Sequence, residues 1–197
     1  MGAMPPMFAT LSVGFGAGCG EVTGEHLSAD IQELLRLFHI HSVRYVIVGG
    51  EAVIRHGYPR LTGDIDLFYD TQPENISRLF AALREFWGGE VPAVERAAEL
   101  AEPVVIQFGR PPNRIDLLST LIGVTFAQAW RGRVSEKLVP RTGKPFPIHY
   151  IGLDQLLENK RRAGRHKDLD DFDQLSGVAR QRTRRRRVGA RRPKRKA

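Results

Sequence analysis

Two aspartates, Asp64 and Asp66, lie two residues apart, and Asp64 comes fourteen residues after the pair Gly49-Gly50. Because side chains alternate between the two faces of a strand, both carboxylates are expected on one face, about 6.6 Å apart. Carboxylates at this spacing can share two Mg²⁺ ions, which lie about 3.5–4 Å apart in two-metal sites. Glycines at a helix N-terminus let a phosphate approach the backbone. The arrangement predicts metal-assisted chemistry on a nucleoside triphosphate.

A third carboxylate, Asp116, lies in a short strand-like segment, with apolar neighbours on the opposite face. If this strand neighbours the Asp64 strand, three acids converge, and like charges held together need cations. We expect Asp64 and Asp66 to hold two Mg²⁺ ions, or Mn²⁺ in their place. Asp116 would complete the metal that activates the attacking hydroxyl and would also take its proton. In the alternative interpretation, Asp64 and Asp66 are solubility charges on an edge strand, which their apolar neighbours disfavour.

The nucleotide is expected to contact residues on either side of the first two acids. Gly49 and Gly50 would bring backbone N–H groups to the β- and γ-phosphates, although the pair alone would indicate a plain turn. Arg60 either clamps a phosphate or pairs with an exposed acid. Thr62 is expected to orient this loop of the nucleotide site through its hydroxyl.

Lys160 follows three leucines at helical spacing and therefore lies on the apolar stripe of its helix. It either extends to solvent or reaches into the cleft and neutralises the triphosphate. Arg165 is a further candidate for nucleotide binding, and Asp168 and Asp171 are candidate supporting residues. Arg165 and Asp168 can pair across one helical turn.

The segments that must position these residues predict an α+β fold: a small mixed β-sheet with helices packed around it and a C-terminal helical segment. Helices are expected over residues 28–40, 51–56, 72–87 and 125–130, and over 153–175 with a break near 164. Strands are expected over 44–48 and 64–69, in a hairpin of 103–108 and 113–118, and before residue 151. We expect a flexible Gly-rich leader (1–27), a core (28–151), helices that complete the site (152–177) and a disordered basic tail (178–197).

The formal charge of +8 on the 197 residues comes from the tail. Eleven of the thirty Arg and Lys residues lie from residue 178 onward, which leaves nineteen basic against twenty-two acidic side chains before it. Such a tail either neutralises nucleic-acid phosphates without sequence preference or is a solvated extension with no role. A single cysteine, Cys19, fits a reducing cytoplasm. Since no apolar run approaches about 20 residues, no membrane association is expected.

The runs at residues 45–53 and 56–67 resemble the nucleotidyltransferase superfamily that includes DNA polymerase beta. Among its members, the chain is most similar to minimal nucleotidyltransferases of the AbiEii toxin-like kind. These carry a Gly-Gly or Gly-Ser turn, an Arg-x-Thr-x-Asp-Ile-Asp segment, a later strand aspartate and a helical Lys…Arg…Asp…Asp motif. The resemblance covers roughly residues 30–176. Glu51 departs from it, because catalytic members often have a small or hydroxyl residue after the glycines.

This resemblance implies transfer of a nucleoside monophosphate from an NTP such as ATP to an acceptor hydroxyl, with release of pyrophosphate. The acceptor would be an RNA 3′ end, as in tRNA, or a protein, and a toxin of this kind would pair with an antitoxin. Because some members are inactive, a second hypothesis is a catalytically inactive nucleic-acid-binding or adaptor protein on the same scaffold. A third is a glycosyltransferase that uses the Asp-x-Asp pair, for which the short chain leaves little room.

Overall fold

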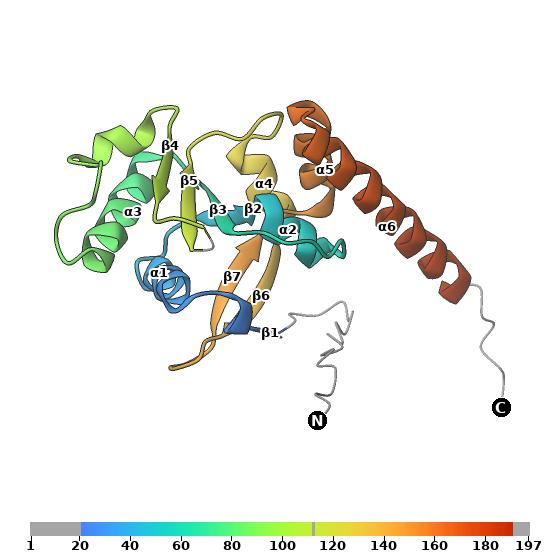
Figure 1. The fold of residues 1–197 in the computed structure, drawn as a ribbon, viewed down its shortest axis with the longest axis horizontal. Helices are drawn as coiled ribbons and strands as arrows, with labels where there is room; N and C mark the ends of the chain where they lie inside the picture. Colours follow the sequence, from blue (N-terminus) through green and yellow to red (C-terminus); the bar gives the residue numbers. More distant parts are fainter. Residues whose placement is uncertain (1–20, 112, 191–197) are drawn as a thin grey trace, which may run out of the picture.

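A computed structural model gives the fold of residues 21–111 and 113–190, with side chains described as far as residue 181. In this part of the chain, seven strands form one mixed sheet in the order β1-β6-β7-β2-β3-β5-β4 (Figure 1). The strands are β1 (Glu21–Thr23), β2 (Tyr45–Val48), β3 (Asp64–Tyr69), β4 (Val105–Phe108), β5 (Arg114–Leu118), β6 (Val134–Val139) and β7 (Phe146–Tyr150). The helices are α1 (Ala29–Ile40), α2 (Gly49–His56), α3 (Pro73–Phe86), α4 (Phe126–Gly132), α5 (Leu153–Ala163) and α6 (His166–Ala190), with 3₁₀ turns at η1 (Gly24–His26) and η2 (Ala97–Ala101). The expected mixed sheet surrounded by helices is confirmed.

The middle of the sheet combines antiparallel and parallel pairing. Strand β3 pairs antiparallel with β2 on one side and parallel with β5 on the other. Strands β4 and β5 form the hairpin that the sequence predicted. Since β3 is central and β5 is its direct neighbour, the two carboxylate-bearing strands lie side by side.

Helices cover both faces of this central sheet. On one face the ring of Phe38 in α1 lies 5.3 Å from that of Tyr45 in β2. On the other face the ring of Phe126 in α4 lies 5.4 Å from that of Phe68 in β3. Phe68 is two residues beyond Asp66 and shares its side of the strand, so the carboxylates open on the face that α4 covers. Helices α5 and α6 lie beside α4 and α2, at the right of the sheet in Figure 1.

A continuous apolar core explains why these segments fold as they do. The stripe expected on α1 is buried, and its side chains pack on the sheet together with those of α3. Burying one such side chain contributes about 1.5–3 kcal/mol. The largest fully buried side chains include those of Phe38, Tyr45, Ile47, Leu67 and Leu79.

Two boundaries differ from the expectation. Residues 21–26, part of the expected flexible leader (1–27), form β1 and η1, because Gln32 donates hydrogen bonds to the carbonyl oxygens of Gly24 at 2.8 Å and Leu27 at 2.9 Å. Residues 178–190, which we placed in a disordered tail, continue α6. Arginine and glutamine have high helix propensities, and the fully buried Leu175 anchors the helix before them. The remainder of the expected leader and tail, residues 1–20 and 191–197, lies outside the described residues.

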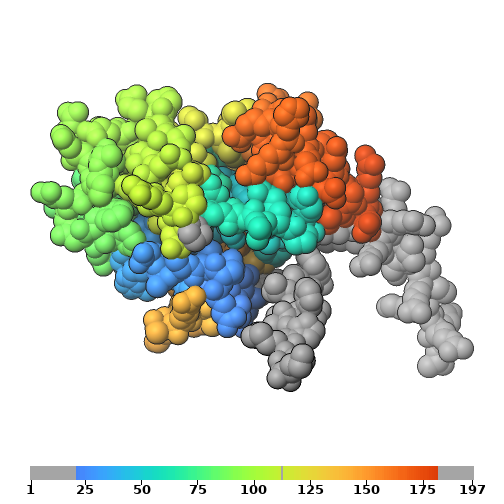
Figure 2. All heavy atoms as spheres, in the orientation of Figure 1, coloured from blue at the N-terminus to red at the C-terminus, as the bar shows by residue number. Residues whose placement is uncertain are grey.

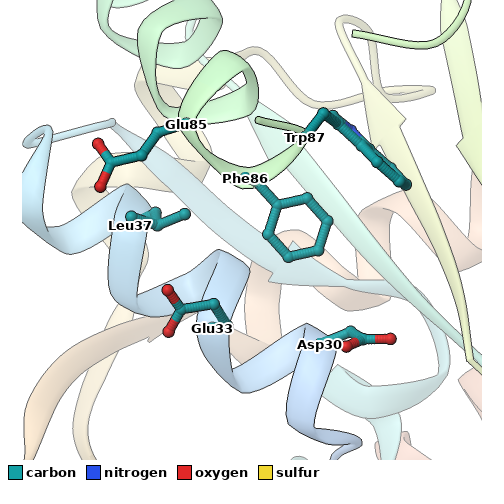
Figure 3. A pocket seen from close by; sticks show the side chains of 6 residues that line it. All are labelled: Asp30, Glu33, Leu37, Glu85, Phe86 and Trp87. Carbon is teal, nitrogen blue, oxygen red and sulfur yellow. The ribbon is translucent and has the colours of Figure 1, made fainter. Parts of the chain in front are cut away.

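A surface hollow of about 510 Å³ lies between α1 and the end of α3 (Figure 3). Its lining joins three carboxylates to apolar and aromatic side chains and contains none of the expected site residues: Asp30, Glu33, Leu37, Glu85, Phe86 and Trp87. Among the helices described, none combines the length and apolar character that crossing a bilayer requires.

Candidate active site

The parallel register of β3 and β5 brings the three aspartates together. Asp66 lies directly opposite Asp116, and Asp64 lies opposite Arg114. Asp116 is 5% exposed, and the other two carboxylates are half-buried. The convergence expected from the spacing is therefore present, and it depends on β5 being the direct parallel neighbour of β3.

The electrostatics of Asp66 reflect this crowding. Burial, followed by the neighbouring negative charges of Asp64 and Asp116, raises the pKa of Asp66 to about 6. The positive charges of Lys160 and Arg114 lower it but do not cancel these effects. A carboxylate with a raised pKa among other acids is a typical binding place for a cation.

The two glycines are required by close packing rather than by a turn alone. Gly49 has φ +59°, and a Cβ atom built on it would lie 1.8 Å from Oδ2 of Asp66. A Cβ atom on Gly50 would lie 2.5 Å from the hydroxyl oxygen of Thr62. The first turn of α2 therefore lies directly against Asp66 and the loop that precedes Asp64.

Thr62 orients Asp64. Its hydroxyl donates to the Asp64 carboxylate at 3.0 Å and lies 3.2 Å from the backbone carbonyl oxygen of the same residue. The loop on which Thr62 lies is tied to α6, because the hydroxyl of Tyr58 donates to Asp170 at 2.9 Å. Figure 2 shows the surface of α2 and this loop adjoining that of α5 and α6. The orienting role expected for Thr62 agrees with this geometry.

Arg60 pairs with an acid that is buried rather than exposed. Its Nε lies 3.1 Å from Oδ1 of Asp171, an ion pair without hydrogen-bond geometry, and Nη2 lies 3.4 Å from Oδ2. Asp171 is 1% exposed. The guanidinium also lies near the glycine turn, since a Cβ atom on Gly50 would be 3.2 Å from Nη2.

Lys160 neither extends to solvent nor lies free in a cleft. Its Nζ lies 2.9 Å from Asp168 and 2.8 Å from Asp171, and all three side chains are at most 5% exposed. The two helices that carry these residues meet at Gly164, whose left-handed conformation (φ +66°) ends α5. This buried ion network joins α5, α6 and the Arg60 loop into one wall of the site.

Arg165 is an exposed cation at the edge of this network, with 80% of its side chain accessible. Its Nε donates to Asp168 at 2.6 Å. Burial would raise the pKa of Asp168, but the hydrogen bonds from Arg165 and Lys160 outweigh that effect and lower it. Since Arg60, Lys160, Asp168 and Asp171 balance in charge, Arg165 gives this network of five side chains one net positive charge.

Two residues that the sequence analysis did not single out belong to the site. Arg114 binds Asp116 through Nε at 2.9 Å and through Nη2 at 3.1 Å, and Nη2 also contacts Asp64. Gln107 on β4 lies opposite Asp116 and donates to it at 3.1 Å. The period of two along β5 could have identified Arg114, because it lies two residues before Asp116. Gln107 could have been identified only from the register of the hairpin.

Glu51 does not extend its charge toward the glycine turn. Its carboxylate lies 3.4 Å from His26 of η1, and only 10% of its side chain is exposed. Hydrogen bonding to Glu51 is the largest cause that raises the pKa of His26. Glu51, which departs from the pattern of the nucleotidyltransferases that the sequence resembles, therefore has a partner in the N-terminal segment.

The donor set suits a hard divalent cation. As the side chains lie, no group of three or more Asp, Glu, His or Cys residues in the described part of the chain forms a ready metal cage. Nevertheless, carboxylate oxygens from Asp64, Asp66 and Asp116 share one face of two adjacent strands, and such oxygens are the ligands that Mg²⁺ prefers. The mutual repulsion at Asp66 is what a bound cation would relieve.

The chain matches no family model and no curated protein sequence.

Proposed function

We propose that the protein is a Mg²⁺-dependent nucleotidyltransferase, which moves a nucleoside monophosphate from an NTP to an acceptor hydroxyl of RNA or protein. One observation carries the proposal: three aspartates on adjacent parallel strands face a glycine turn that admits no Cβ atom beside Asp66. Asp64, Asp66 and Asp116 would hold the metal. When bound, it would supply charge neutralisation at the phosphates and a lowered pKa for the attacking hydroxyl.

The remaining residues of the site would position the substrate. The backbone N–H groups at the start of α2 would receive the β- and γ-phosphates, as helix N-termini do. Arg165, which is exposed beside the site, is better placed than the doubly paired Lys160 to add positive charge near the triphosphate. Lys160 would act as a positioning residue, because it fixes Asp171 and through it Arg60. Catalysis would then consist of orientation and electrostatic stabilisation at the α-phosphate.

Transfer of label from α-labelled NTPs to total RNA and to lysate protein tests the proposal. Wild-type protein with Mg²⁺ is expected to label one acceptor class, and Asp66→Asn and Asp116→Asn are expected to lose at least about a hundredfold in rate. Asp70→Asn is the matched control, since Asp70 is a buried carboxylate just beyond the same strand that pairs with Arg44 at 2.7 Å. Equal labelling by wild type and both site variants would refute the proposal.

A second function is favoured by the composition of α6. Its distal half carries Arg180 and five further arginines up to residue 187, on a helix that projects from the body in Figure 1. A helix of this charge binds nucleic acid through its phosphates, with an affinity that falls steeply as salt increases. A non-catalytic nucleic-acid-binding protein would retain that binding after Asp66→Asn and lose it after truncation at Gly177. Unchanged RNA binding by the truncated chain would exclude this alternative.

A further inference from the structure

The carboxylate cluster already contains a cation, the guanidinium of Arg114. Arg114 and Asp116 lie two residues apart on β5 and therefore on one face, and Asp64 lies opposite Arg114 on β3. The guanidinium donates to both oxygens of Asp116, through Nε and Nη2, and Nη2 also reaches Asp64. Two of the three expected metal ligands are thus occupied by one side chain.

Arg114 is held in this position and is not a mobile surface charge. Its side chain is 29% exposed, while those of Asp64 and Asp116 are 25% and 6% exposed. As an arginine, Arg114 stays charged at any pH at which the protein folds. A guanidinium forms a planar, paired contact with a carboxylate that a metal ion would have to replace.

Asp66 differs from its two neighbours in this respect. Its carboxylate accepts no side-chain hydrogen bond among the described residues, and its oxygen lies against the open backbone of Gly49. It is therefore the carboxylate that a metal ion can bind without breaking a side-chain hydrogen bond. On Asp64 and Asp116, Arg114 is a charged donor, whereas the Thr62 hydroxyl and the Gln107 amide that also donate to them are neutral.

We propose that Arg114 is a resident cation that competes with the divalent metal for Asp64 and Asp116 and so sets the metal affinity of the site. The inference rests on the proposed metal-dependent function. In the metal-free protein Arg114 offsets the repulsion among the acids. When a metal ion binds, the guanidinium leaves at least one carboxylate, and its donors face the side of the site where the nucleotide phosphates are expected.

Calorimetric titration of the full chain with Mg²⁺ and with Mn²⁺ tests this competition. Arg114→Gln is expected to bind either metal at least about tenfold more tightly than wild type, because an opposing charge beside the ligands is gone. Arg114→Lys, which keeps the charge but not the paired contact, is expected to lie between them. Arg36→Gln is the matched control, because Arg36 forms an exposed ion pair with Glu33 at 2.6 Å on α1. The metal affinity of this variant should equal that of wild type.

A purely structural Arg114 gives the opposite result. If Arg114 only held the strands together, Arg114→Gln would bind metal more weakly than wild type or equally well, and either result overturns the inference while the proposed function stands. If neither wild type nor the variants bind Mg²⁺ or Mn²⁺, the metal site itself fails and both proposals fall.

A second measurement observes Arg114 in the wild-type protein and uses a variant only for assignment. The arginine Nε–H resonances of ¹⁵N-labelled wild type, with Arg114 assigned by comparison with Arg114→Lys, report its hydrogen bond to Asp116 directly. Saturating Mg²⁺ is expected to shift this resonance or to broaden it through solvent exchange. If neither the Nε–H nor the Nη–H resonances of Arg114 change while calorimetry shows metal binding, the inference is overturned.

Discussion

Replacing Asp66 by asparagine should stabilise the metal-free protein. Burial and two neighbouring acids raise the pKa of Asp66 from 3.8 to about 6. Between these values the folded chain holds a proton that the unfolded chain has lost, so the stability contributed by this group falls as the pH rises through that window. A shift of about 2 units corresponds to a cost of about 3 kcal/mol above pH 6. Asparagine has the same shape and no charge, and it should recover up to that amount.

Urea unfolding followed by circular dichroism in EDTA measures this change. At about pH 7.5 the free energy of unfolding of Asp66→Asn should exceed that of wild type by about 2–3 kcal/mol, or about 4–12 °C in midpoint temperature. At about pH 4 wild-type Asp66 is mostly protonated, and the difference should nearly vanish. Saturating Mg²⁺ should reverse the order, since the metal binds and stabilises only the wild-type ligand set.

Asp70→Asn distinguishes the crowding of charges from a general effect of removing a buried carboxylate. Asp70 is 6% exposed, but Arg44 lies 2.7 Å away and compensates its charge. Its replacement should therefore lower the free energy of unfolding at about pH 7.5, by about 1–3 kcal/mol. If Asp66→Asn also destabilises the protein, or gains as much at pH 4 as at pH 7.5, the electrostatic account of the site is wrong.

Three further predictions concern other parts of the site and of the sheet. Lys160→Met removes the cation that the buried Asp168 and Asp171 share and leaves each of them with one arginine partner, which should cost about 3–5 kcal/mol in urea unfolding, whereas Arg161→Met, on an exposed part of the same helix, should cost under about 1 kcal/mol. Gly49→Ala should lose about a hundredfold in transfer rate because its Cβ displaces a carboxylate, while Gly88→Ala, also at positive φ but with open space, should retain wild-type rate. Burial lowers the pKa of His149 to about 4, so the folded chain binds fewer protons than the unfolded chain between about pH 4 and 6.5, and stability is lost as the pH falls. In urea unfolding, His149→Gln should reduce the decrease in the free energy of unfolding between about pH 6.5 and 4 by up to about 3 kcal/mol. If the pH dependence of the free energy of unfolding is the same as in wild type, His149 is not a buried neutral histidine.

The backbone of the site could be predicted because its signals are local. The period of two identifies the shared face of Asp64 and Asp66, and the hairpin of β4 and β5 follows from two β-rich runs around a Gly-Pro turn. The structure confirms both. Sequence alone did not show whether β5 neighbours β3, and the convergence with Asp116 was therefore conditional until the parallel register was known.

The partners of charged side chains could not be predicted in the same way. An alternating pattern shows which face a side chain occupies, but not which group from another element meets it there. Arg114 follows the same period as Asp116 and was overlooked, because its role depends on Asp64 lying across the strand. The prediction of a disordered basic tail differs from the structure for another reason. Net charge favours disorder, but in residues 178–190 helix propensity and the continuity of α6 outweigh it.

The ion network around Lys160 links the two features that the sequence did not predict, namely the partners of buried charges and the extension of α6. A lysine on an apolar stripe avoids the cost of desolvating its charge only if it reaches solvent or pairs with carboxylates. Here the carboxylates belong to α6, after the turn at Gly164. Docking of α6 is therefore needed to keep Lys160 buried, and through Asp171 it also holds Arg60 beside the glycine turn. The arginines that follow belong to the same helix. A nucleic acid bound along the distal part of α6 would consequently be attached to the element that forms one wall of the candidate active site.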